Sequence, residues 1–190
     1  MKTKFYGLFL ALFGAVVLTS CDKQDDIRIS DVPSAVMNSF DANFPNASRA
    51  EWEKKSGCYV ADFWQDGMDI SAWYNPNGEW LMTESDLGVN LSVLPQAVQD
   101  AFKSSQYANW HVDDIDKYER PSGVFYLIEV EKAGQQDRDW FYDEDGTLLK
   151  NVVDAEQGEV LPNISVNLRK YSWMKESRGL PGSLLLSKIF

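Results

Sequence analysis

Two tight-turn signals, Asp66-Gly67 and Asn77-Gly78, constrain the fold of this chain more than any other feature. Both lie between short runs in which apolar residues alternate with other residues. Asp, Asn and Gly tolerate the positive φ that both central residues of a type I′ turn need, so the pattern predicts two consecutive β-hairpins. A two-residue loop at Asp66-Gly67 sets the first register and pairs Gln65 with Met68, Phe63 with Ile70, Ala61 with Ala72 and Tyr59 with Tyr74.

This register divides the hairpin residues between two faces of a sheet. One face is almost entirely apolar, and the same alternation adds Ala50 and Trp52 to it. The other face mixes carboxylates with large aromatic rings: Glu51, Glu53, Val60, Asp62, Trp64, Asp69, Ser71, Trp73, Trp80 and Met82. We expect no raised pKa at Asp62 or Asp69, because Ser71 and Trp64 are their partners across the strands.

An internal repeat extends the pattern to most of the chain. The stretch 32–40 is echoed by 94–102, Ser56-Gly57-Cys-Tyr59 by Ser122-Gly123-Val-Phe125, and Trp73-Tyr-Asn-Pro-Asn-Gly78 by Phe141-Tyr-Asp-Glu-Asp-Gly146. We predict an α+β fold of two tandem repeats, each with one helix and a four-stranded antiparallel meander. Side by side, the two units can form a continuous eight-stranded sheet with the helices on one face.

Each unit opens with an apolar stripe at helical spacing. The stripes are Val32, Val36, Phe40 and Phe44 in the first unit and Leu94, Val98 and Phe102 in the second, with Asp31 as the expected N-cap of the first helix and Tyr107 marking the end of the second. The predicted strands are 48–55, 58–65, 68–74 and 79–85, then 110–119, 124–132, 137–142 and 147–153.

The first residues have the layout of a secretory signal peptide. Lys2 and Lys4 precede an apolar run from Phe5 to Leu18, which is short for a membrane span. The ending Leu18-Thr-Ser-Cys21 resembles the lipobox of bacterial lipoproteins, in which the cysteine is acylated; an ordinary signal peptide is the alternative. The acidic stretch 22–26 resembles a surface-export signal of Bacteroides-type lipoproteins, or is a solvated tether.

These patterns divide the chain into five predicted regions. They are a signal peptide at 1–20, a lipidated tether at 21–30, the first repeat at 31–86, the second at 87–154, and a partial third-repeat helix or irregular tail at 155–190. Within the last region, Val160-Leu-Pro162 is the predicted start of the third helix, because it aligns with Leu94-Pro95. A tail that packs across the second unit is the alternative to a truncated repeat.

Charge limits the partners that we expect. The net charge is −11, so phosphate neutralisation is disfavoured and no nucleic acid is expected. The expected membrane contact is only an N-terminal lipid anchor in the outer membrane, on its surface or periplasmic side. A basic protein partner or a cation stays open.

The residues that support catalysis are few. His111 is the single histidine, and Cys58 is the one cysteine left after lipidation, so neither a His-based metal centre nor a Cys/His dyad is indicated. We expect His111 to be structural and Cys58 to pack as a small hydrophobe. Asp143-Glu-Asp-Gly146 is too short for an EF-hand loop and reads as a hairpin turn. The sequence predicts a protein that is not an enzyme and has no cofactor or metal.

The duplicated helix and meander, the Tyr-Asn-Pro-Asn-Gly and Tyr-Asp-Glu-Asp-Gly turns and the lipoprotein signal together resemble the PepSY-like family related to the beta-lactamase inhibitory protein. The resemblance covers about Ile29 to Asp154. It implies a non-catalytic extracytoplasmic module that binds a protein on its sheet. Lactamase inhibition itself is not implied, because no specific loop of that inhibitor matches this chain.

The aromatic face is the predicted ligand-binding site. Its expected members are Val60, Trp64, Trp73, Trp80, Met82, Tyr126, Ile128, Phe141 and Leu148. Contiguous apolar patches seldom stay open to water, and Trp and Tyr are frequent in binding hot spots, so we expect a protein or peptide partner. The alternatives are burial of this face under the helix or between the two units, self-association as a homodimer in a structural envelope protein, and glycan binding.

Overall fold

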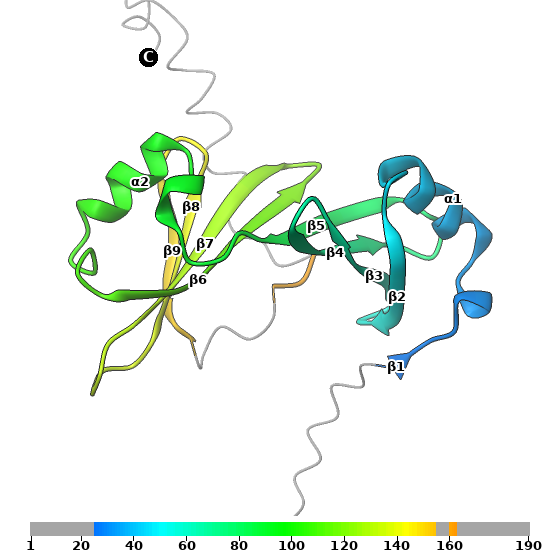
Figure 1. Ribbon diagram of the computed structural model, residues 1–190, viewed down its shortest axis with the longest axis horizontal. Helices are drawn as coiled ribbons and strands as arrows, with labels where there is room; N and C mark the ends of the chain where they lie inside the picture. Colours follow the sequence, from blue (N-terminus) through cyan, green and yellow to red (C-terminus); the bar gives the residue numbers. More distant parts are fainter. Residues whose placement is uncertain (1–24, 155–159, 163–190) are drawn as a thin grey trace, which may run out of the picture.

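The structure, a computed structural model, describes residues 25–154 and 160–162 (Figure 1). The predicted signal peptide, Cys21 and the tail from residue 163 onward lie outside the described residues. The helices are α1 (Ser34–Asn43) and α2 (Gln96–Lys103), with short 3₁₀ turns η1 (Ile29–Asp31) and η2 (Leu91–Val93). The strands are β1 (Asp25–Asp26), β2 (Ser48–Lys55), β3 (Cys58–Gln65), β4 (Met68–Tyr74), β5 (Trp80–Asp86), β6 (His111–Arg120), β7 (Gly123–Glu131), β8 (Arg138–Asp143) and β9 (Leu148–Val153).

The strands form one antiparallel sheet in which each strand pairs with its neighbours in the chain, in the order β1 to β9. Figure 1 shows β5 running between the two halves, with α1 and α2 near opposite ends of the molecule. The predicted α+β class and continuous antiparallel sheet are confirmed, and β1 adds a short ninth strand at the edge. The predicted register of the first hairpin, from Gln65–Met68 to Tyr59–Tyr74, is also confirmed.

Both helices cover the same face of this sheet. Val36 and Phe40 of α1 pack into a buried cluster with Trp52, Phe63 and other residues of β2 to β4. Val98 and Phe102 of α2 pack in the same way on residues of β6 to β8. The register runs from Ile70 through Ser85 and Lys117 to Tyr126, so the two clusters lie on one side of the strands.

The ends of the helices differ from prediction. Pro33 precedes α1 without a side-chain cap, and Asp31 instead ends η1 and forms an ion pair with Arg28, so the predicted N-cap role of Asp31 is wrong. Where we expected a tether, β1 pairs with the edge of β2, and the Ile27 N–H group donates a hydrogen bond to the Trp52 backbone oxygen before η1 begins. α2 ends at Lys103, earlier than the predicted Tyr107.

Each meander has the same turn between its third and fourth strands. The Asn75 Oδ1 atom accepts hydrogen bonds from the backbone N–H groups of Asn77 and Glu79, at 2.9 and 3.0 Å. The Asp143 Oδ1 atom accepts from the N–H groups of Asp145 and Thr147, at 3.0 and 2.8 Å. The prediction that Asp143-Glu-Asp-Gly146 forms a hairpin turn is confirmed.

The glycine that closes each turn touches the first turn of the preceding helix. Gly78 has a φ of 83°, and a Cβ on it would lie 2.5 Å from the backbone oxygen of Ala35 in α1. Gly146 has a φ of 76°, and a Cβ there would collide with the backbone oxygen of Ala97 in α2. Only glycine combines this backbone conformation with so close an approach. The two turns therefore fix where each helix lies on the sheet.

A β-bulge follows each of these turns. The pairing shifts from Tyr74–Trp80 to Trp73–Met82, which leaves Leu81 as an extra residue. It shifts likewise from Tyr142–Leu148 to Phe141–Lys150. A bulge turns the residues on its two sides to opposite faces. Trp80 therefore packs with the α1 cluster, and the prediction that it shares a face with Met82 is wrong.

The contact between Gly78 and α1 can be tested by substitution. We expect Gly78→Ala to lower the free energy of unfolding by about 2–4 kcal/mol, because it adds a collision to an unfavourable φ. Gly67→Ala is the matched control: it has a φ of 86° with no atom within 4 Å of the added Cβ, and should cost only about 1 kcal/mol. Urea denaturation measures both, and equal costs would contradict the role of the helix contact.

Candidate functional site

The candidate site is the open face, which we define as the side of the sheet opposite α1 and α2. Strand pairing places five of the nine predicted ligand-binding residues there: Val60, Trp64, Trp73, Met82 and Phe141. The bulges move Trp80 and Leu148 out of this set, opposite Tyr74 and Tyr142. Tyr126 and Ile128 belong to the α2 cluster on the helix side.

The error at Tyr126 and Ile128 has a physical cause in the turn between β6 and β7. In the first meander Ser56-Gly57 forms the turn, and Lys55 pairs with Cys58. In the second, Pro121-Ser122 forms it, and Gly123 already pairs with Arg120 as a strand residue. Aligning Gly57 with Gly123 therefore shifts the pattern by one residue, which moves every side chain of β7 to the other face.

The centre of the open face is a buried apolar cluster to which both meanders contribute. Val60, Trp73 and Met82 meet Tyr118, Phe125, Leu127 and Phe141, and Val160 packs among them. Trp73 is only 1% exposed. The alternative that the two units bury these residues between them therefore holds for Val60, Trp73, Met82 and Phe141.

Cations cover three aromatic rings of this cluster. The Lys55 Nζ atom lies 5.7 Å from the centroid of Trp73, the Arg120 guanidinium carbon 4.9 Å from Phe125, and the Lys150 Nζ atom 5.5 Å from Phe141. Such contacts between a cation and the face of an aromatic ring are attractive. These rings are thus already partnered within the chain.

Trp64 is the large exposed aromatic residue of the open face, with 61% of its surface accessible. It lies near the tip of the β3–β4 hairpin, opposite Asp69 on one side and Ser48 on the other. Asp62, two residues earlier, accepts a hydrogen bond from the Ser71 hydroxyl. Burial raises the pKa of Asp62, although its hydrogen bond with Ser71 lowers it, so the expectation of no raised pKa there is wrong.

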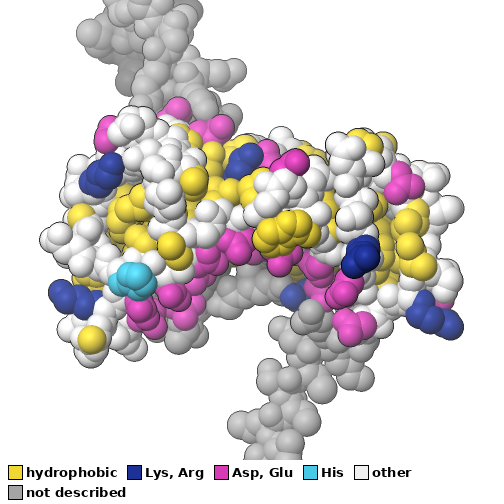
Figure 2. Space-filling model, in the orientation of Figure 1, with side chains coloured by type: hydrophobic (Ala, Val, Ile, Leu, Met, Phe, Trp, Pro, Cys, Tyr) yellow, Lys and Arg dark blue, Asp and Glu magenta, His cyan; other side chains and the backbone are white. Residues whose placement is uncertain are grey.

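Carboxylates form an acidic band beside the apolar centre, defined by Asp62, Asp69, Glu84, Asp86, Asp114, Asp116, Glu129 and Asp139. Figure 2 shows acidic side chains gathered along the lower middle of the molecule. Burial, followed by the charges of Glu84, Asp114 and other neighbours, raises the pKa of Asp116 to about 8.

The carboxyl groups of the band on β7 and β8 also have raised pKa values. Burial and the charge of Asp139 raise the pKa of Glu129 to about 7, and burial raises the pKa of Asp139 to about 6. We did not predict the part of the band in the second meander. The alternation of Asp114 and Asp116 in a predicted strand was the available signal.

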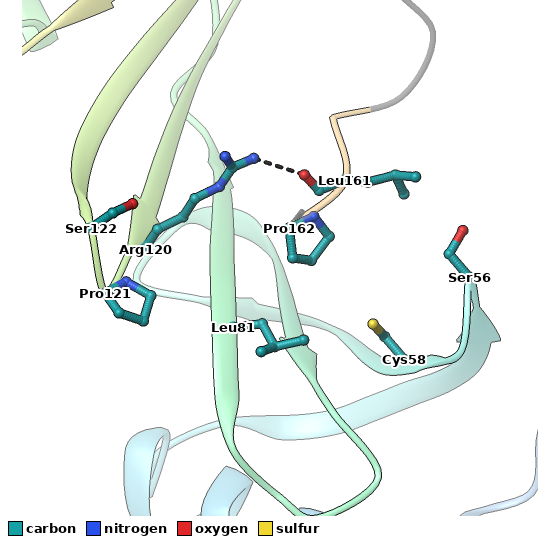
Figure 3. A pocket seen from close by; sticks show the side chains of 8 residues that line it. All are labelled: Ser56, Cys58, Leu81, Arg120, Pro121, Ser122, Leu161 and Pro162. Carbon is teal, nitrogen blue, oxygen red and sulfur yellow. Dashed lines mark hydrogen bonds between the residues drawn. The ribbon is translucent and has the colours of Figure 1, made fainter. Parts of the chain in front are cut away.

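A pocket of about 340 Å³ opens at one end of this face (Figure 3). The Arg120 Nη2 atom donates a hydrogen bond of 2.9 Å to the backbone oxygen of Leu161 at its rim. Burial raises the pKa of Cys58 and so favours the unreactive thiol. The lining is mostly apolar with a few polar groups, as in sites that take a small apolar group: Ser56, Cys58, Leu81, Arg120, Pro121, Ser122, Leu161 and Pro162.

His111 lies exposed at the start of β6, away from the apolar centre. Its ring nitrogens and carboxylate oxygens of Asp113 and Glu131 lie within 4.8 Å of one another, close enough to hold one metal ion. All three side chains are exposed to solvent. Such a site would lack the packed second shell that tight metal centres use.

Comparison with known proteins agrees with this architecture. The family model described as "Putative beta-lactamase-inhibitor-like, PepSY-like" matches residues 17–70 and 57–150. The chain belongs to this family. No curated protein matches it. Within the part that the structure describes, there is no helix long and apolar enough to cross a membrane.

Solved structures of Bacteroides proteins share the fold. A DUF2874 family protein from Bacteroides ovatus is 33% identical, with a TM-score of 0.63 over 68% of this chain and 92% of that one. A BLIP-like protein from Bacteroides fragilis is 35% identical, with a TM-score of 0.60 over 67% and 92%. A Bacteroides eggerthii chain, titled as "putative periplasmic proteins", is 27% identical, with a TM-score of 0.60 over 64% and 88%.

The raised pKa values predict a pH dependence. Asp116 and Glu129 hold a proton in the folded state up to about pH 8 and 7, whereas the unfolded carboxyl groups release it near pH 4. The folded state therefore binds more protons over this range, and the free energy of unfolding should fall as the pH rises. We expect a loss of about 1–3 kcal/mol between pH 5.5 and pH 8, measured by urea denaturation.

Asp116→Asn should remove much of that loss, because an amide stays neutral at both pH values. The exposed Asp41→Asn on α1 is the matched control and should keep the loss. Stability that is flat, or that rises from pH 5.5 to pH 8, would contradict the buried acidic band.

Proposed function

We propose that this chain is a non-catalytic lipoprotein of the cell envelope that binds a protein or peptide on the open face of its sheet. The observation that carries the proposal is the exposed indole of Trp64 on a face where the other large rings are buried. On the same face, Trp73 is only 1% exposed. We therefore attribute the exposure of Trp64 to a role in binding. Exposed Trp is frequent in binding hot spots.

Two further features support a partner on this face. The pocket lined by Cys58 and Leu81 offers an apolar recess for a side chain of the partner. The BLIP-like name of the Bacteroides fragilis relative refers to an inhibitory protein, which acts by binding. The elements that catalysis would need are few, since Cys58 is held as a thiol and His111 lies in the other meander.

We infer that the two helix–meander units arose by duplication, as the repeated sequence predicts. The same turn, the same glycine contact and the same bulge occur in each unit, at Gly78 and Leu81 and again at Gly146 and Leu149. The inner edges of the units then pair through β5 and β6. Duplication doubles the width of the sheet and so enlarges the open face.

The envelope location rests on the N-terminal sequence and on a relative titled as periplasmic. We expect Cys21 to carry the lipid that holds the protein in the outer membrane. Cells fed a fatty-acid analogue should label the wild-type protein and leave Cys21→Ala unlabelled. The same variant at Cys58 is the control and should keep the label, and persistent labelling of Cys21→Ala would refute the anchor.

A pull-down from envelope extract tests the binding site. We expect Trp64→Ala to lose the captured partner while its melting temperature changes by less than about 2 °C, because an exposed side chain contributes little to stability. Val89→Ala is the matched control, since Val89 is also exposed but lies outside the sheet. Equal capture by wild type and Trp64→Ala would contradict the proposal.

The same preparation separates the two alternatives. Light scattering without any added ligand would show a dimer lost in Trp64→Ala if the face serves self-association. Binding of sugars on a glycan array that is lost in Trp64→Ala would show a glycan-binding module instead.

A further inference from the structure

We propose that the acidic band of the open face binds an extended, lysine- or arginine-rich segment, with Trp64 at one end of the contact. The proposal rests on the proposed function, because it names the chemistry of the partner for the same face. It is a different claim, since Trp64 could bind a partner to which the band contributes nothing.

The band is formed by directly opposed like charges. Asp86 pairs with Asp116 between β5 and β6, Asp114 pairs with Glu129 between β6 and β7, and Glu129 pairs with Asp139 between β7 and β8. Like charges directly opposite each other destabilise a sheet. The three pairs lie on consecutive strands, and the repulsion within them lowers the free energy of unfolding. A bound cationic ligand would relieve this repulsion.

The carboxylates of the band are short of cationic partners within the chain. Among the residues that the structure describes, Asp86, Asp114, Asp116 and Glu129 form no ion pair with a lysine or arginine. Burial, and then the charges of Asp114, Glu129 and other neighbours, raise the pKa of Asp116. The band therefore offers carboxyl groups that no lysine or arginine of the described chain pairs with, and an external cation would displace the protons that Asp116 and Glu129 hold near neutral pH.

Asp139 provides a second and independent observation. Its side chain is 1% exposed, and its Oδ1 atom has no hydrogen-bond partner among the described residues, although Lys150 and Arg138 are near enough to lower its pKa. A buried acceptor without a donor is costly. An incoming ammonium or guanidinium group beside Glu129 would supply the donor that this end of the band lacks.

The spacing favours several separated charges over a single metal ion. In the described part of the chain, no three carboxylates of the band bring their oxygens within 4.8 Å of one another, unlike His111, Asp113 and Glu131. The band crosses β3 to β8, and strands lie about 4.8 Å apart, so it extends over about 24 Å. An extended peptide rises about 3.3 Å per residue, so about seven residues span it.

Trp64 suits the end of such a segment. Its exposed ring lies opposite Asp69, the carboxylate of β4 at the edge of the band. A lysine or arginine over the ring would gain a cation–π contact while it pairs with Asp69. The chain already covers Trp73, Phe125 and Phe141 with its own cations, which leaves Trp64 as the ring of this face open to one from outside.

The test is calorimetric titration with a blocked nine-residue peptide that carries lysine at alternate positions and serine between them. We expect binding to the wild-type protein in 50 mM salt that weakens at 300 mM salt, since surface charge pairs are screened. The double variant Asp116→Asn/Glu129→Gln should bind roughly tenfold more weakly. The control Asp41→Asn/Asp100→Asn removes two exposed carboxylates of α1 and α2, the same number of carboxyl groups, and should bind as the wild type does.

Three results would overturn the proposal. One is no binding of the peptide, and another is an equal loss in the band and control variants, which would show only a response to net charge. The third is calcium binding that needs Asp116 and Glu129 and displaces the peptide at equal ionic strength, which would make the band a metal site. Circular dichroism confirms that each variant is folded.

The outcome is separable from that of the proposed function. If envelope capture needs Trp64 while the peptide does not need Asp116 and Glu129, the binding face stands and the cationic partner is wrong. If the peptide binds through the band but Trp64→Ala captures as the wild type does, the site of partner binding proposed above is wrong.

Discussion

The close contact between a turn glycine and the first turn of a helix is the constraint on which this structure depends. Gly78 meets Ala35 and Gly146 meets Ala97, each where a side chain would collide with the helix backbone. This contact presses each helix onto one side of its meander, and the continuous register puts both helices on the same side. Among the described residues no helix covers the other side of the sheet, and this side is the open face on which we propose that a partner binds.

The apolar centre and the acidic band of the open face differ in how the chain covers them. The apolar centre is closed by the chain itself: residues of both meanders pack together, Tyr118 stacks on Phe125 within the second meander with ring centroids 4.8 Å apart, and cations cover several of the rings. The acidic band is not closed in the same way, and like charges stand opposite each other across the strands. Burial next to these neighbours keeps some of the carboxyl groups protonated near neutral pH, Asp116 most of all. The opposed carboxyl groups lower the stability of the sheet, and if the band binds a cationic segment as proposed, the same groups would favour binding.

Membership of the PepSY-like family and similarity to the Bacteroides structures agree with the architecture of one antiparallel sheet and two helices. On this chain's open face, the features that bear on the proposed binding are the exposed Trp64, the pocket beside Arg120 and the acidic band. They lie on one surface, so one partner can contact all three. A lipid anchor at Cys21 would place this surface at the membrane from which the partner is approached.

The sequence by itself determined the local structure of this protein. Asp66-Gly67 fixes a two-residue turn, so the pairing of β3 with β4 and the bounds of β2, β3 and β4 followed from it, and the helical stripes around Val36 and Val98 placed the helices. Tertiary structure alone decided the faces beyond the first hairpin. The bulges at Leu81 and Leu149 turn Trp80 and Leu148 away from the open face, and the earlier turn at Pro121-Ser122 reverses Tyr126 and Ile128. Because side chains alternate with a period of two, a single extra residue reverses a face, and no local preference shows where it is inserted. Likewise, the burial of Trp73 depends on the second meander, which lies far along the chain and meets the first only in the folded sheet.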